Sequence, residues 1–287
     1  DAGHLVVACA VDVANHELAM GRYKSGRDWA RWALGEYARR GVREEHRREL
    51  AAATLAFGQI LLGELDAARE VLRTVPVDVA KVGMPTYEAV VSTVADMHVL
   101  DGRLDEAHAL CTTLKRRAPL TQVASASLDV TKVNIARGDL LAAKESAEYA
   151  YSLSRGAPRA QAATGALGMG MALSYFDVDR AAELLEAAAR QLEQTNLQLL
   201  QTQALLWLAR CRLTVGRRDE AARCLAEAAE GTRELAEPGW RLLMACDPAY
   251  AELHAMAHGG GGALKVRLLG EPRLEYRSRE LGLTLRQ

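Results

Sequence analysis

Gly63-Glu64-Leu65-Asp66-Ala67-Ala68 decides the fold, because a phrase of the same form returns along the chain. The phrase consists of a glycine, any residue, an apolar residue, two further residues and an alanine. It recurs as Gly102-Arg103-Leu104-Asp105-Glu106-Ala107 and as Gly138-Asp139-Leu140-Leu141-Ala142-Ala143. Weaker copies begin at Phe176 and Gly216, and Gly26 is interpreted as a degenerate sixth copy. The chain is therefore expected to consist of a repeated unit.

The spacing of the copies indicates two helices in each unit. From Gly63 onward, successive copies begin 39, 36, 38 and 40 residues apart. A glycine ends the first helix by adopting a backbone conformation that other residues resist. The apolar residue then covers the turn, and the alanine lets the second helix approach closely. Apolar residues follow at helical spacing, as in Ala107, Leu110, Cys111 and Leu114, so six helix pairs are predicted.

The phrase resembles the middle of the tetratricopeptide motif, in which a helix A, a glycine turn and a helix B carrying alanine form each unit of about 34 residues. The resemblance covers most of residues 15–236 and points to the longer, degenerate repeats of bacterial MalT-like regulators. It implies an all-α, right-handed superhelical solenoid. The large aromatic residues that the motif places early in helix A are missing. Residues 238–258 are expected to form one terminal helix that caps the solenoid, which gives a repeat domain over residues 1–258.

Composition agrees with a folded helical protein. The 287 residues are 49% hydrophobic and 25% charged, with a net charge of −1, and only 5% are aromatic. Such a chain has ample apolar surface to bury, and it contains few of the aromatic residues that favour large sheets. The five cysteines form no CxxC pair and are expected to be free thiols, and no signal peptide or membrane span is evident, so a cytoplasmic location is predicted. The chain begins at Asp1 and is expected to be a piece of a longer protein.

The composition and the hydrophobic pattern of the sequence change after residue 258. Four glycines at 259–262 are expected to be a linker, because glycine disfavours helix. Beyond it, residues 263–287 alternate as short strands and carry six basic and three acidic side chains. The stretch 264–275, with its Leu-Gly-Glu-Pro phrase at 269–272, resembles the opening strands of the winged-helix DNA-binding domain of Streptomyces antibiotic regulatory proteins and OmpR-like regulators.

This second resemblance implies a truncated DNA-binding domain. The helices that read DNA in that family come later in sequence than residue 287, so the fragment alone is expected to bind DNA weakly or not at all. Its basic residues closest to DNA would be Lys265, Arg267 and Arg273. The alternative is that these strands are a fortuitous pair on a solvated basic tail.

One row of residues on the first helices is the strongest candidate for a binding site. Counting six residues back from each turn position gives Phe57, Asp96, Lys132, Gly170 and Arg210. Three of them are charged within otherwise apolar helices, and the first helices line the concave surface of a solenoid. Asp96, Lys132 and Arg210, with Gln203 nearby, are therefore predicted to bind a peptide, a protein or a small-molecule effector. The alternative is that these charges pair with one another or face water.

Catalysis is not expected, because no nucleophile and base arrangement, phosphate loop or metal motif is evident. His254 and His258 lie four residues apart but have no further ligand in sequence. No cofactor, metal or membrane partner is predicted. The preferred hypothesis is the regulatory region of a bacterial transcriptional regulator that responds to an effector and meets DNA only through a complete winged-helix domain. The alternative hypothesis is a plain protein-interaction adaptor.

Overall fold

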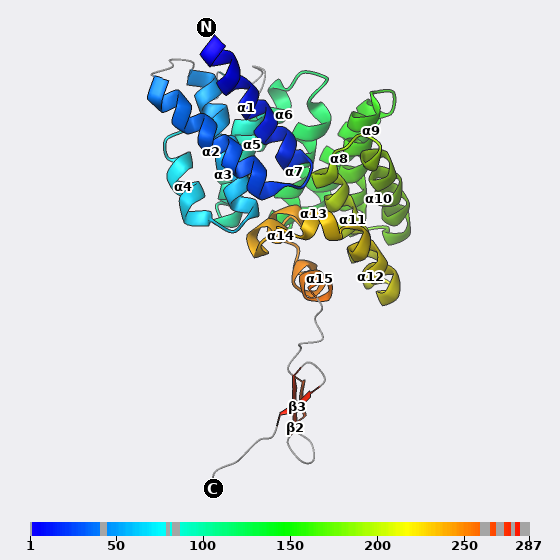
Figure 1. Ribbon diagram of the computed structural model, residues 1–287. Helices are drawn as coiled ribbons and strands as arrows, with labels where there is room; N and C mark the ends of the chain where they lie inside the picture. The colour runs from blue at the N-terminus through cyan, green and yellow to red at the C-terminus, as the bar shows by residue number, and fades with distance from the viewer. Residues whose placement is uncertain are drawn as a thin grey trace.

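The computed structural model describes residues 2–40, 45–78, 81, 87–258, 265–267, 273–276 and 279–281, and side chains for 5–40, 46–78, 81 and 87–258. The first twelve helices form the six predicted pairs (Figure 1). The pairs are α1 (Ala2–Ala19) with α2 (Tyr23–Arg40), α3 (Glu45–Leu61) with α4 (Leu65–Leu72), α5 (Tyr87–Leu100) with α6 (Leu104–Arg117), α7 (Val123–Arg137) with α8 (Leu140–Ser154), α9 (Arg159–Leu173) with α10 (Val178–Glu193), and α11 (Gln198–Thr214) with α12 (Arg218–Glu227).

The packing follows the order of the chain. The two helices of each pair contact each other, and the first helices of adjacent pairs also make contact, as α3 contacts α5 and α7 contacts α9. Such contacts between sequence neighbours characterise a helical repeat array. The main core is therefore long, and it is filled by small and medium side chains such as Ala143, Leu167 and Leu185. The all-α prediction is confirmed for the helical part of the chain.

Gly138 shows why glycine occupies the turns. Its φ is +77°, in the left-handed region where a side chain is strained. The Gly138 N–H donates to the carbonyl of Ile135 and the Asp139 N–H to that of Asn134, each at 2.9 Å. These bonds satisfy the last carbonyls of α7 and reverse the chain into α8. Gly63, Gly102 and Gly216 adopt the same conformation.

The prediction that Gly26 begins the first copy of the phrase is wrong. The turn between α1 and α2 lies at Gly21, whose φ is +74°. Gly26 instead holds the position of the phrase's alanine, five residues after the turn. A Cβ on Gly26 would lie 2.6 Å from Leu18 Cγ of α1. The two helices approach so closely there that even alanine would force a shift.

The turn that contains Phe176 departs from the others. It has no residue with positive φ, and the N–H groups of Phe176 and Asp177 both donate to the carbonyl of Leu173, at 2.8 Å. The Asp177 side chain then caps α10 by accepting from the Arg180 N–H at 3.1 Å. Without glycine the chain takes a different path between α9 and α10, and this changes the register of residues counted back from Phe176.

The single terminal helix predicted over residues 238–258 is also wrong. The segment after α12 forms α13 (Ala229–Thr232), α14 (Glu237–Leu243) and α15 (Ala249–Ala257). The break between α14 and α15 has two non-glycine residues with positive φ, Ala245 at 49° and Cys246 at 56°, and Pro248 directly precedes α15. Helical periodicity in the sequence did not reveal this break, because α14 and α15 both carry apolar residues at similar spacing.

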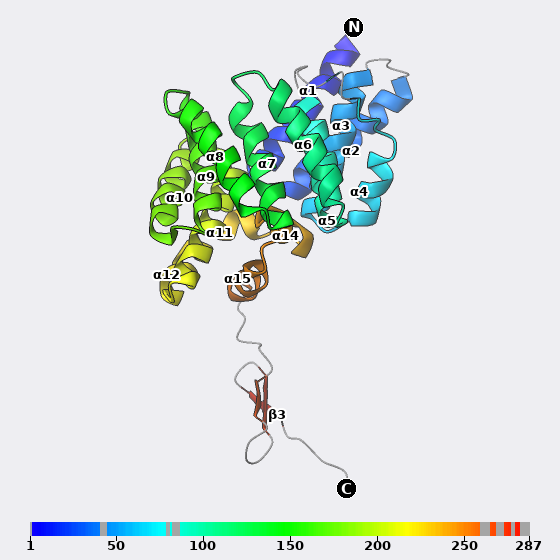
Figure 2. The same cartoon turned by 180° about the vertical axis from the view of Figure 1, so that it is seen from behind.

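The segment that contains α13 and α14 returns to the beginning of the array, whereas α15 contacts α11 and α12 (Figures 1 and 2). The Tyr23 hydroxyl donates to the carbonyl of Gly231 at 2.8 Å, and the Ala236 N–H donates to that of Leu61 at 2.9 Å. The helix α14 contacts α3 and α5, and α11 contacts α1. The terminal segment therefore does more than cap the last pair. It joins the two ends of the array, so the first helices surround a common centre.

Among the described residues after α15 there are three short strands. They are β1 (Lys265–Arg267), β2 (Arg273–Tyr276) and β3 (Arg279–Leu281), paired antiparallel in the order β1-β2-β3. Val266 pairs with Leu274, and Leu274 with Leu281. The predicted glycine linker at 259–262 lies outside the described residues. Among the described helices, none has both the length and the apolar character that crossing a membrane requires.

Candidate ligand-binding cavity

The first helices line an open cavity of about 570 Å³. Its wall is formed by α1, α3, α5, α7, α9 and α11, and α14 contributes from the terminal segment. Most of the wall is apolar and includes Leu18, Phe57, Leu128, Leu200 and Leu242. A cavity of this size, with apolar walls and a few polar groups, has the general form of a site for small molecules.

Lys132 is at the centre of the polar side of this cavity. Its ammonium lies 3.4 Å from Asp96 Oδ1 on α5 and 3.3 Å from Asp129 Oδ1 on α7. The Ser92 hydroxyl donates to the other oxygen of Asp129 at 2.6 Å. All three charged side chains are at most 15% exposed. The predicted pair Asp96 and Lys132 is thus brought together.

One ammonium here serves two carboxylates. Burial acts to lower the pKa of Lys132, but the negative charges of Asp96 and Asp129 outweigh it and hold that pKa above its ordinary value. Burial raises the pKa of Asp96, and Lys132 opposes this shift only in part because Asp129 also repels negative charge there. The cluster is therefore acidic on balance, and a second positive charge would stabilise it.

Glu88 extends the acidic side of the cavity along α5. The Ser125 hydroxyl on α7 donates to Glu88 Oε1, and no ion pair to Glu88 is present among the described residues. Burial raises the pKa of Glu88 to about 7, opposed by the Ser125 hydrogen bond and supported by repulsion from Asp129. Near neutral pH the carboxyl group is therefore partly protonated, and a nearby cation would favour the ionised form.

Gln203, the fourth predicted site residue, lines the cavity and also binds the end of α14. Its side-chain amide donates to the carbonyl of Leu243 at 2.8 Å, and the indole N–H of Trp207 donates to the same oxygen at 3.0 Å. Gln203 is only 2% exposed. These two bonds attach the end of α14 to α11, so Gln203 positions the segment that covers the cavity.

Arg210 lies elsewhere, and its predicted place beside Asp96 and Lys132 is wrong. Its Nε lies 2.9 Å from Asp247 Oδ2 in the link between α14 and α15, and its Nη1 donates to the carbonyl and the hydroxyl of Ser174, each at 3.2 Å. The guanidinium packs 4.2 Å from the centre of the Tyr175 ring, and the Tyr175 hydroxyl donates to Asp247. Arg210, which belongs to α11, therefore connects the terminal segment at Asp247 with the end of α9 at Ser174.

Gly170 does not belong to the row either. A Cβ there would lie 2.6 Å from Leu185 Cγ of α10, so this side of α9 faces its own second helix. The register is shifted because the turn after α9 lacks glycine. Phe57, by contrast, lines the cavity as its position in the row predicts.

Four residues of these sites were missed in the sequence: Glu88, Ser125, Asp129 and Asp247. A signal for them exists in the repeat spacing. Ser92 contacts Asp129 and Glu88 contacts Ser125, each across 37 residues, and Asp96 contacts Lys132 across 36. Polar residues one repeat apart on adjacent first helices therefore identify partners, which a search for a single row of charges overlooks.

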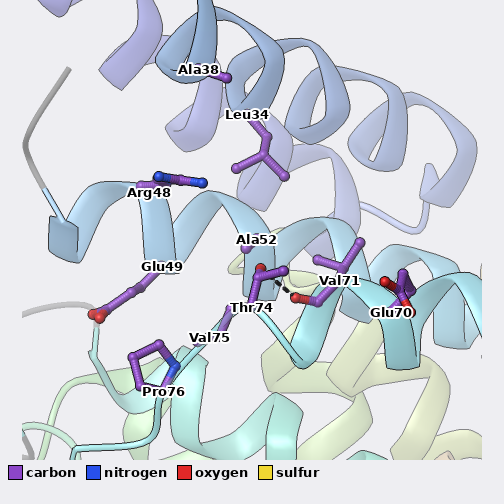
Figure 3. Close-up of a pocket in the computed structure, with 10 residues that line it drawn as sticks. All are labelled: Leu34, Ala38, Arg48, Glu49, Ala52, Glu70, Val71, Thr74, Val75 and Pro76. Carbon is purple, nitrogen blue, oxygen red and sulfur yellow. Dashed lines mark hydrogen bonds between the residues drawn. The ribbon is translucent and has the colours of Figure 1, made fainter. Parts of the chain in front are cut away.

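A second cavity, of about 380 Å³, lies on the outer side between α2, α3 and α4 (Figure 3). Its wall includes Leu34, Ala52 and Val71, and the Thr74 hydroxyl donates to the carbonyl of Val71 at 2.7 Å. Glu49, a carboxylate in its α3 wall, is paired with Lys81 at 2.8 Å. This cavity has fewer polar groups directed at a common centre, so the central cavity is the better candidate site.

The remaining predicted residues have other surroundings. Lys265, Arg267 and Arg273 belong to β1 and β2, but their side chains lie outside the described part of the structure. His254 and His258 pack on Trp240, with ring centres 5.2 Å and 5.9 Å away. Within the described residues, no three His, Cys, Asp or Glu side chains are grouped as metal ligands.

Comparison with known proteins supports the fold. No protein-family model matches the chain, and no curated protein is similar to it. Among solved structures, it is similar to a Signal Transduction ATPase with Numerous Domains from Pyrococcus horikoshii that has a tetratricopeptide repeat sensor. The TM-score is 0.50 with 13% identity over 88% of this chain, which spans 41% of that protein.

Two further structures are less similar. BtubC from P. vanneervenii covers 74% of this chain at 15% identity with a TM-score of 0.47, and 91% of its own length is matched. PilF of Pseudomonas aeruginosa covers 89% at 17% identity with a TM-score of 0.46, and 99% of its length is matched. Together with the repeated helix pairs, the first similarity shows a tetratricopeptide-like fold.

Proposed function

We propose that this chain is a sensor and interaction scaffold whose central cavity receives an effector. The observation that carries the proposal is that the first helices of successive pairs and α14 line one common cavity. A molecule bound there touches both ends of the array at once. Its binding energy would therefore favour the closed arrangement over any arrangement in which α14 leaves α3 and α5. No catalytic step is part of the proposal.

The regulatory role that we propose is that of a bacterial transcriptional regulator. Three features support it: the resemblance to MalT-like repeats, the resemblance of residues 264–275 to the start of a winged-helix domain, and the sensor described for the similar Pyrococcus ATPase. In this proposal the six pairs follow a right-handed superhelix, and β1–β3 begin a domain whose later helices contact DNA. Effector binding would change how the terminal segment presents that domain.

A plain adaptor is the second candidate, and the surface of the first pair favours it. Trp29 and Trp32 are 43% and 42% exposed, and Leu5 and Val6 on α1 lie beside them. Trp29 stands eight residues after the turn glycine. Val71 holds the equivalent position in α4, eight residues after Gly63. It packs against the hydrophobic cluster that contains Ala30 of α2. The exposed face therefore continues the stacking interface of the repeats, and its partner in an adaptor would be another helix pair.

The experiment for the sensor proposal blocks the cavity. Ala89 is an exposed cavity-lining residue on α5, so Ala89→Trp would fill the space without disturbing the core. Ala222→Trp, at an exposed site on α12 away from the cavity, is the matched control. Melting temperatures would be measured with a library of cellular metabolites. The proposal predicts compounds that stabilise the wild type and Ala222→Trp but not Ala89→Trp. Equal stabilisation of all three proteins would contradict it.

A further inference from the structure

We propose that the effector is an organic cation with an apolar body, whose ammonium or guanidinium group pairs with Glu88 while the body lies against the leucine-rich wall. This inference rests on the proposed sensor function of the cavity and specifies its ligand class. The ligand is defined by its chemistry: one positive charge near α5 and α7, and an apolar portion that reaches α1, α3 and α14.

Charge balance is the first argument. The titratable side chains that line the cavity are Glu88, Asp96, Asp129 and Lys132. They comprise three acids and one base, and both partners of that base are acids of the cluster, Asp96 and Asp129. Glu88 has a hydroxyl partner and no cation within the described part of the chain. An unpaired carboxylate in a largely apolar cavity is the group for which a ligand cation offers the greatest gain.

The position of Glu88 is the second argument. Of the two Glu88 oxygens, Oε1 accepts from the Ser125 hydroxyl, which also has the Gln122 carbonyl within 3.0 Å, and no hydrogen bond to Oε2 is present among the described residues. Both oxygens belong to a side chain that lines the cavity. The Ser125 bond orients the carboxylate without neutralising it, and this leaves Oε2 available for a charge-assisted hydrogen bond from a ligand N–H.

Anions fit the same cavity poorly. Among the described residues that line the cavity, Lys132 is the one cation, and it is held between Asp96 and Asp129. An anionic ligand would therefore have to displace a carboxylate and remain near two others. The apolar part of the ligand follows from the other walls, where Leu18, Phe57 and Leu242 come from three separate helices. Burying apolar atoms against these side chains supplies the non-directional part of the affinity.

The test uses three probes of one shape and different charge: 4-phenylbutylamine, 4-phenylbutanol and 4-phenylbutyrate. Binding to the full chain would be measured by calorimetric titration. The proposal predicts the order amine, alcohol, acid, with the amine at least about tenfold tighter than the acid, because only the amine makes a charge-assisted bond to Glu88. In Glu88→Gln the amine should lose about tenfold, whereas Glu145→Gln, at an exposed carboxylate on α8, should leave it unchanged.

A pH series separates a charge interaction from a purely structural effect. Glu88 titrates with a pKa of about 7, whereas an alkyl ammonium stays protonated to about pH 10. Amine affinity should therefore rise between about pH 6 and pH 8 in the wild type, and this rise should become smaller in Glu88→Gln. The charged groups that face the same space, Asp96, Asp129 and Lys132, are present in both proteins.

The outcomes distinguish the two proposals. Tighter binding of the acid or the alcohol, blocked by Ala89→Trp, would overturn the cationic ligand class but keep the cavity as a binding site. Amine binding that is equal in the wild type and Glu88→Gln would overturn the role of Glu88. If no probe and no metabolite responds to Ala89→Trp, the sensor function itself fails.

Discussion

Lys132 and Arg210 stand at the same place in the repeat, six residues before Gly138 and Gly216, yet they do different things. Lys132 faces the central cavity and is shared by Asp96 and Asp129. Arg210 is covered by the link between α14 and α15 and pairs with Asp247. The difference comes from what lies against each position. In the middle of the array a first helix borders the cavity, whereas at its end the terminal segment folds over the same position.

The largest expected effect is on stability at the Arg210 side. Arg210→Ala leaves Asp247, which is 5% exposed, without its cation, and it also removes two bonds to Ser174. We expect a loss of about 3–5 kcal/mol in the free energy of unfolding, because an uncompensated buried charge is costly. Urea unfolding would measure it. A loss below about 1 kcal/mol would show that the contact is as weak as a surface ion pair.

A matched change on the cavity side should cost less. Lys132→Ala leaves two carboxylates together, but they border a cavity that water can enter and can relieve repulsion by binding a proton. We expect a loss of about 2 kcal/mol near neutral pH, measured by urea unfolding in parallel with Arg210→Ala. Removing a carboxylate as well, in Lys132→Ala with Asp96→Ala, should restore part of it. A loss equal to that of Arg210→Ala would remove the distinction between the two sides.

The sequence predicted the parts of this picture that depend on local structure. The turns at Gly63, Gly102, Gly138 and Gly216 follow from a backbone conformation that glycine adopts most easily, so the helix pairs were predictable. Asp96 and Lys132 were found because charges are conspicuous in apolar helices. The predictions that failed concern contacts between distant segments or the register of a residue on its helix.

Four failures show this. The partner of Arg210 lies in a segment whose return to the array no local pattern encodes. Gly170 was assigned to the row because its turn has lost the glycine that fixes the counting. Gly26 was mistaken for a turn because the close approach of α1 and α2 also requires glycine. Glu88 was overlooked since a single carboxylate near the start of a helix resembles a solvated group.

A third prediction concerns the pH dependence of stability that Glu88 contributes. Its pKa rises from an ordinary value of 4.5 to about 7 on folding, so the folded protein holds this proton more tightly than the unfolded chain does. The unfolding free energy should therefore decrease as the pH rises from about 4.5 to 7, because charging Glu88 costs more in the folded state. Glu88→Gln should make that part of the profile flatter. Urea unfolding at several pH values would check it, and an unchanged slope would contradict the assigned surroundings of Glu88.

The central claim, that the first helices and α14 surround one ligand site while the Arg210 contact is structural, is tested most directly by hydrogen exchange of the wild-type protein with and without 4-phenylbutylamine. We predict slower amide exchange in α5, α7 and α14, which line the cavity, and unchanged exchange in the outer helices α8 and α12. Protection confined to the outer helices, with α5, α7 and α14 unaffected by the bound amine, would contradict the claim.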